Sequence, residues 1–161
     1  MSDDNLSRMI RLADEFFETR NDPAQISVTE DVMEHLRRIH PSTLTEENNG
    51  TGPIAWIMVI PTTWAIMELF IAGQITERAI LESTPLDIPY DAIYLCSALV
   101  RPEQRRRGIA KRLAIDAISS IRKDHPIREL FYWAFSVEGQ KLAESVARSV
   151  GLPLRERVDT K

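Results

Sequence analysis

Cysteine, glycine and long apolar runs are all scarce in this sequence of 161 residues. The one cysteine, Cys96, excludes an intrachain disulfide framework, and six glycines without a repeated segment exclude a collagen-like chain. No apolar run reaches the length of a membrane-spanning helix. The opening residues, MSDDNLSRMIRLADEFF, lack the basic segment and long apolar run of a secretory signal. We therefore expect a cytoplasmic protein with no membrane partner.

The overall composition is that of one soluble globular domain spanning residues 1–161. Hydrophobic residues make up 43% of the chain and charged residues 27%, with a net charge of -4, which separates it from disordered chains. His35, His40 and His125 have neither metal-ligand spacing nor a cysteine partner nearby. We therefore assign no metal site.

The first part of the chain, residues 1–50, reads as helix-rich. Apolar residues between Leu6 and Phe17 recur at helical spacing, and a second helix is expected from the cap residue Thr29 to just before Pro41. The segment 42–53 is rich in polar and turn-forming residues, which predicts a loop.

Two apolar runs in the middle of the chain predict buried strands. Residues 54–60 form a continuous apolar run, which we expect to be buried on both faces and stopped by Pro61. Thr63 and Thr76 are placed to cap two short helical pieces, interpreted as a helical crossover. The second run, residues 92–100, follows them.

The last third of the chain alternates helix and strand. An apolar stripe at helical spacing starts after Gly108, and a third apolar strand is expected at 129–135. A helix over 137–150 and an edge strand over 154–158 follow. Alternating strands and helices predict an α/β fold with a mixed sheet flanked by helices.

The stretch EQRRRGIAKRL, residues 103–113, concentrates positive charge where the second apolar strand passes into a helix. A helix start presents free backbone N–H groups and the positive end of the helix dipole, which together favour an anion. Gly108 lets the backbone approach a phosphate without a Cβ, and Ala110 keeps the next turn slim. The neighbouring arginines add charge-assisted hydrogen bonds. The segment therefore predicts a pyrophosphate ligand.

The pattern Arg105-x-x-Gly108-x-Ala110, after a strand ending Leu99-Val100, resembles motif A of the GNAT superfamily of N-acetyltransferases. The chain has neither a Walker loop nor a dinucleotide-binding glycine pattern. The resemblance covers about residues 92–152 and implies a GNAT-like fold whose coenzyme A-binding half holds acetyl-CoA. The residues that it implies for coenzyme A binding are Leu99, Val100, Arg105, Arg106, Arg107, Gly108, Ile109, Ala110 and Lys111.

The resemblance also implies a mechanism. The sheet would splay between the strand ending at Val100 and the strand ending near Phe135, with the pantetheine arm in the cleft. Backbone amides near Leu99 and Val100 would bind that arm and polarise the thioester. An amine, whose identity the sequence does not give, would attack directly in a ternary complex without a metal. This is acyl-CoA-dependent N-acyltransfer.

The sequence departs from the family pattern at the catalytic positions. Ala147 stands where many members have a tyrosine acid, and Tyr94, the weak catalytic candidate, stands where the histone-acetylating branch has a carboxylate base. Typical members also place three or four strands before motif A, whereas the N-terminal half of this chain shows one clear strand. The sheet is therefore either reduced or has its early strands in stretches such as 24–28. Cys96, among apolar residues, reads as a core residue.

Two other functions stay open. The chain is alternatively a noncatalytic acyl-CoA-binding or regulatory module that retains the anion cradle. The third reading, a nucleic-acid-binding protein using the arginine cluster, is disfavoured by the acidic chain and the glycine at the turn. A homodimer is compatible with each of them.

Overall fold

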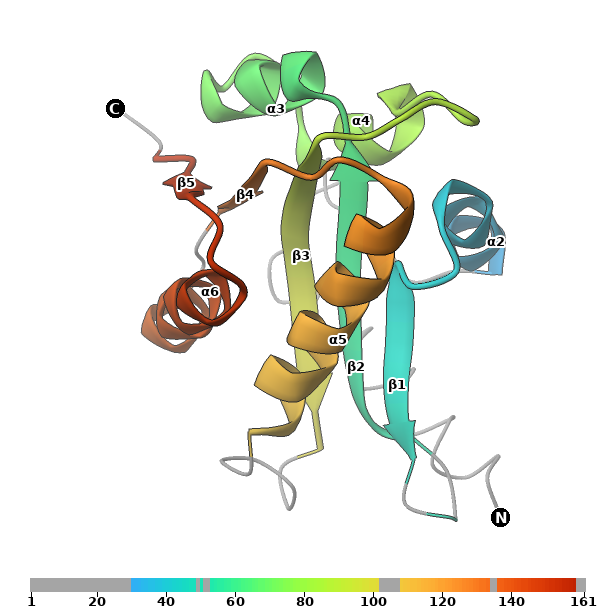
Figure 1. Ribbon diagram of the computed structural model, residues 1–161, viewed down its shortest axis with the longest axis vertical. Coiled ribbons are helices and arrows are strands. Elements are labelled where there is room, and N and C mark those ends of the chain that lie inside the picture. The colour runs from blue at the N-terminus through green and yellow to red at the C-terminus, as the bar shows by residue number, and fades with distance from the viewer. Residues whose placement is uncertain (1–29, 49, 51–52, 102–107, 134–135, 159–161) are drawn as a thin grey trace.

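The computed structural model describes residues 30–48, 50, 53–101, 108–133 and 136–158, which form an α/β fold (Figure 1). Its helices are α2 (Glu30–Ile39), α3 (Trp64–Ile71), α4 (Glu77–Ser83), α5 (Ile109–Asp124) and α6 (Val137–Val150). Its strands are β1 (Leu44–Asn48), β2 (Pro53–Thr62), β3 (Ala92–Val100), β4 (Glu129–Tyr132) and β5 (Leu154–Glu156). The predicted mixed sheet flanked by helices is confirmed.

The five described strands form one sheet in the order β1-β2-β3-β4-β5. The pairs β1–β2 and β2–β3 are antiparallel, whereas β3–β4 and β4–β5 are parallel. Helix α5 packs against β1, β2 and β3 and against α6 (Figure 1). The apolar stripe on α5 therefore covers the antiparallel part of the sheet, and α6 stands beside the parallel part.

Strand β2 is the centre of the core, because all ten of its residues are buried. It continues past Pro61, which pairs with Ile93, so the prediction that Pro61 stops the strand is wrong. Val59 donates its N–H to Thr43 on the β1 side, and Pro61 faces the same side two residues later. The β1–β2 register starts at Leu44–Met58, so the missing N–H of Pro61 falls beyond that ladder.

The prediction of a loop over residues 42–53 is also wrong, because this segment contains β1. Leu44 pairs with Met58, and the ladder runs on to Asn48, with Glu46 and Glu47 between them. Consecutive glutamates do not show the alternation typical of a strand. The neighbouring ladder, and not a hydrophobic pattern, selects the extended conformation here.

The helices α3 and α4 begin at the predicted caps. Thr63 accepts a hydrogen bond from the Ile66 N–H at 3.3 Å, and Thr76 accepts one from the Ala79 N–H at 3.1 Å. Their interpretation as a crossover is wrong, because β2 and β3 are antiparallel neighbours. The two helices instead close one end of the sheet, at the top of Figure 1.

The remaining predicted elements fall into two groups. The helices expected before Pro41, after Gly108 and over 137–150 are confirmed as α2, α5 and α6, and the strand over 92–100 as β3. Strand β4 ends at Tyr132 and β5 at Glu156, earlier than expected. The helix over residues 6–17, the stretch 24–28 and residues 102–107 and 134–135 lie outside the described residues.

Two histidines join the ends of α2 and α5. Nδ1 of His40 accepts the Ser42 N–H at 3.0 Å, so Nε2 carries the proton and donates to Asp124 at 2.7 Å. Nδ1 of His125 accepts the Tyr90 N–H at 3.2 Å, and the two imidazole rings lie 5.8 Å apart. Protonating His125 at Nδ1 would therefore break its hydrogen bond to the Tyr90 N–H.

This arrangement predicts a loss of stability in mild acid. Burial, and then the neighbouring His40, lower the pKa of His125 below its usual 6.5, against the opposing effect of Asp124. The unfolded chain then binds the proton more tightly than the folded one, so stability is lost as the pH falls below 6.5 towards the folded pKa. Denaturant unfolding between pH 5 and pH 8 measures this loss.

The variant His125→Gln should flatten that pH dependence, because glutamine keeps an acceptor and cannot be protonated. His35→Gln is the control, since His35 contacts the Leu81 carbonyl from a different part of the fold. An acid limb that His125→Gln leaves unchanged would contradict the assignment to His125.

Candidate functional site

Strand β4 pairs with only the first half of β3. Their ladder runs from the Ala92–Glu129 pair to the Leu95–Tyr132 pair, and there β4 ends. Strand β3 continues for five more residues, Cys96–Val100, held in register by β2. The distance covered by this extension is about 16 Å at roughly 3.3 Å per residue. The β3–β4 ladder therefore ends at Leu95, and we call the point where β3 runs on past the end of β4 the fork.

A bulge lies at the fork. In the β2–β3 ladder Met58 pairs with Ser97 and Val59 with Leu95, so Cys96 is an extra residue on β3. The Cys96 thiol donates to Oε1 of Glu77 at 3.7 Å, and the Tyr94 hydroxyl donates to the same oxygen at 2.7 Å. The first residue of α4 is thereby tied to both ends of the bulge.

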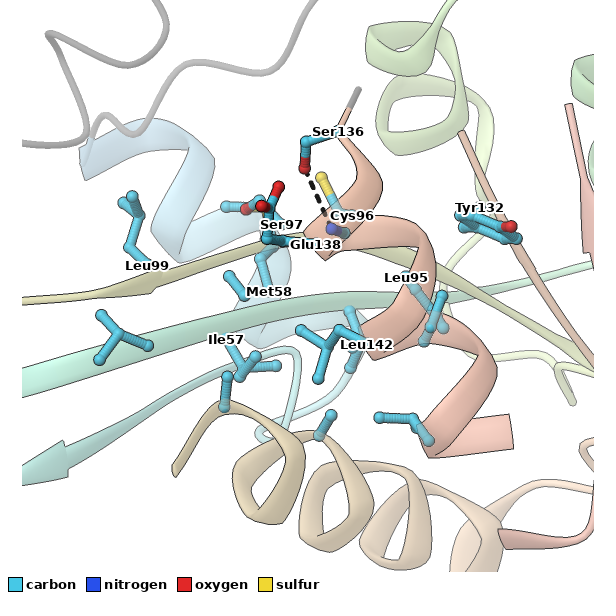
Figure 2. A pocket seen from close by; sticks show the side chains of 18 of the residues that line it. Ile57, Met58, Leu95, Cys96, Ser97, Leu99, Tyr132, Ser136, Glu138 and Leu142 are labelled. Atoms are coloured by element: carbon cyan, nitrogen blue, oxygen red, sulfur yellow. Dashed lines mark hydrogen bonds between the residues drawn. The ribbon is translucent and has the colours of Figure 1, made fainter. Parts of the chain in front are cut away.

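A cavity of about 630 Å³ occupies the fork, between β2, β3, α5, α6 and the end of β4 (Figure 2). Figure 2 shows Ile57 and Leu142 on the α5 side of the strands, and Cys96, Ser97 and Ser136 on the opposite side. The wall consists of Ile57, Met58, Val59, Leu95, Cys96, Ser97, Ala98, Leu99, Val100, Ala110, Ala114, Tyr132, Trp133, Ser136, Glu138, Gly139, Leu142, Ala143 and Val146. The cavity is thus mainly apolar, with its polar groups gathered on one side.

The start of α5 has the geometry expected of an anion cradle. Gly108 precedes the helix at φ 71°, in the left-handed region, and contributes no side-chain cap. A Cβ built on Gly108 would meet nothing within 4 Å, so this side of the turn is open. The first backbone bond of the helix joins the Arg112 N–H to the Gly108 carbonyl at 3.0 Å, which leaves the earlier N–H groups outside the helical ladder.

The structure places three of the six described residues of the expected coenzyme A site in the cavity wall. These are Leu99, Val100 and Ala110, whereas Gly108, two residues before Ala110, is not part of the wall. Ile109 is buried in the core and Lys111 is half-buried. Arg105, Arg106 and Arg107 lie outside the described residues.

The two expected catalytic positions lie away from the cavity. Tyr94 is fully buried and is not part of the wall, and its hydroxyl is bound to Glu77. Ala147 faces a separate shallow depression beside Gly151, whereas Ala143 and Val146 of the same helix face the cavity.

Sequence reasoning gave Tyr132 only a packing role, but the structure places it at the fork. It is 5% exposed and lines the cavity at the last β3–β4 pair. Burial, followed by the charges of Glu156 and Glu144, raises the pKa of Tyr132 to about 12. The phenol therefore keeps its proton throughout the neutral range.

Comparison with protein-family models, curated proteins and solved structures gives no match to this chain. None of the described helices is long and apolar enough to cross a membrane. Within the described ranges, no three His, Cys, Asp or Glu side chains are grouped to hold a metal ion. The functional conclusion therefore depends on the site geometry and the motif.

The bond from Tyr94 to the buried Glu77 predicts a stability difference between two tyrosine variants. Tyr94→Phe leaves a buried side-chain oxygen without this donor, so the free energy of unfolding should fall by about 1–3 kcal/mol. Tyr90→Phe is the matched control, because Tyr90 is equally buried but its hydrogen bond to the Pro85 carbonyl is only partly buried. Its loss should be about 0.5–1.5 kcal/mol. Equal losses in urea unfolding would contradict a larger cost at the buried Glu77 oxygen.

Proposed function

We propose that this chain is an acyl-CoA-dependent N-acyltransferase of the GNAT type. The observation that carries the proposal is the fork: the β3–β4 ladder ends at Leu95–Tyr132, and a cavity of about 630 Å³ lies beside the β3 extension. That volume lies within the range of about 300–1,000 Å³ typical of small-molecule sites.

The outer end of the cavity, at the start of α5, supports the anionic part of an acyl-CoA ligand. Ala110, in the first turn of α5, is part of the wall, and Gly108 opens the backbone immediately before it. The dipole of a 16-residue helix and its first N–H groups favour a pyrophosphate there. By the resemblance, Arg105, Arg106, Arg107 and Lys111 supply the charge-assisted hydrogen bonds.

The β3 extension supports the middle of the ligand. A β-strand recognises an extended chain of amides through its own N–H and C=O groups, as in strand addition to a sheet. The pantetheine arm has such amides, and we place it along Cys96–Val100, where β4 no longer covers β3. The bulge at Cys96 changes the direction of the backbone at the inner end, where the thioester would lie.

The proposed reaction is direct attack of an amine nitrogen on the thioester carbonyl carbon. A carbon–nitrogen bond forms, the carbon–sulfur bond breaks, and the amine proton balances the departing thiolate. Acyl-CoA supplies the activated acyl group, and the chain positions the two substrates, which can lower the barrier by several kcal/mol. Tyr132 is the described phenol in the wall, and its proton is held at neutral pH, so we assign it no proton transfer.

The second candidate is an acyl-CoA-binding module without turnover. It is favoured by one specific observation: Tyr94 and Ala147, the positions that the family would use for base and acid, both lie outside the cavity wall. The two candidates share the ligand and differ in release of free coenzyme A in the presence of amines. Acetyl-CoA turnover with a panel of small amines, and with water alone, therefore separates them.

Gly108→Glu should weaken acetyl-CoA binding by roughly a hundredfold or more. A carboxylate about 4 Å from a phosphate repels it by about 4 kcal/mol at an effective dielectric constant of 20. Gly151→Glu is the matched control, because Gly151 has nearly the same φ, 72°, and equally open space around its Cβ. Both variants bear the same backbone strain, about 1–2 kcal/mol. A difference between their acetyl-CoA affinities in titration calorimetry therefore measures the effect of a carboxylate at the start of α5.

Acetyl-CoA at one hundred times its dissociation constant should also raise the free energy of unfolding of the wild type by about 2.7 kcal/mol. Absence of stabilisation at saturating acetyl-CoA would contradict both candidates. Binding of duplex DNA that falls steeply with salt, with no preference for coenzyme A, would instead indicate the nucleic-acid reading.

A further inference from the structure

The inner end of the cavity is more apolar and more deeply buried than its outer end. Val59 and Val146 are each 1% exposed, yet both line the cavity, together with Leu95 and Tyr132 at the fork. Val59 belongs to β2, the strand beyond β3, so the cavity extends under the sheet towards α5 and α6. The space thus continues past the strand edge that we assign to the pantetheine arm.

Small side chains keep this inner space open. Ala114 of α5 and Ala143 of α6 are each 5% exposed and both face the cavity. A leucine at either position would extend a larger side chain into the same volume. At this point each helix therefore presents an alanine methyl group to the cavity.

The inner end has few polar groups that could bind a polar ligand. Among the wall residues that the structure describes, Glu138 carries the one formal charge, and it lies in the first turn of α6 beside Ser136. At the fork itself, the Tyr132 phenol is uncharged, because burial, followed by the charges of Glu156 and Glu144, raises its pKa to about 12. An apolar group gains most from entering such a site, by about 0.8 kcal/mol per buried methylene.

We propose that the acyl group carried by this chain's substrate is a straight aliphatic chain longer than acetyl, bound at the inner end of the cavity between Ala114 and Ala143. The inference rests on the proposed function, because it takes the thioester to lie at the fork. The same cavity is lined by Ala110 in the first turn of α5 and by Val59 and Tyr132 at the inner end, so a ligand whose anionic end lies at the start of α5 presents its opposite end to the apolar wall. An acyl chain is the part of an acyl-CoA that matches that wall.

The test is calorimetric binding of acetyl-, butanoyl-, hexanoyl- and octanoyl-CoA, with free coenzyme A as reference. For the wild type we expect affinity to rise by about fourfold for each added methylene until the inner end is full. Ala143→Leu should abolish this increase while leaving the affinity for free coenzyme A within about threefold. Ala147→Leu is the matched control, since Ala147 has the same 5% exposure on the same helix but faces away from the cavity. It should retain the increase.

The outcomes distinguish a failure of the acyl site from a failure of the proposed function. If the protein bound free coenzyme A and all four thioesters with the same affinity, the acyl site would be overturned and the proposed function would remain intact. A chain-length increase that survives in Ala143→Leu, or is lost equally in Ala147→Leu, would also overturn the acyl site. Failure of every ligand, free coenzyme A included, to bind the wild type would overturn the proposed function itself. Should melting show that Ala143→Leu is unfolded, Ala114→Leu closes the same space from α5 and decides in its place.

Discussion

The ladder between β2 and β3 is the constraint on which the rest of the structure depends. It runs from the Ala55–Val100 pair to the Thr62–Ala92 pair and places a fully buried strand beside β3 along nearly its whole length. Because β2 holds β3 in register, β3 can run five residues past the end of β4 and still stay extended. The fork and the cavity both follow from this one-sided support.

The sequence made some of these elements predictable because burial and hydrophobic pattern agree. Strands β2 and β3 are apolar along their length, and α5 shows one apolar stripe, so their types and approximate bounds could be predicted. Strand β1 could not, because Glu46 and Glu47 follow one another on a half-exposed strand whose conformation comes from pairing with β2. The prediction that Pro61 stops the strand failed for a related reason, since the effect of a missing N–H depends on which neighbouring strand that N–H would face.

The candidate site was predictable at its outer end and not at its inner end. Gly108 is recognisable because a turn between a strand and an amphipathic helix is a local feature. Ala143 and Ala147 look equivalent in the sequence, since both lie on the buried stripe of α6, and only the packing of that helix decides which one faces the cavity. The bond between Glu77 and Tyr94 joins residues 17 apart and leaves no periodic signal.

The cavity has a consequence for how the fold responds to compression. Unfolding under hydrostatic pressure is driven by the elimination of internal void volume, so the part of the 630 Å³ cavity that excludes water enlarges that volume change. Much of the wall belongs to β2, β3 and α5, so the volume is released when the main core opens and not when a peripheral segment detaches. A molecule that fills the cavity removes this volume from the balance, so the occupied protein should be stiffer and more resistant to pressure than the empty one.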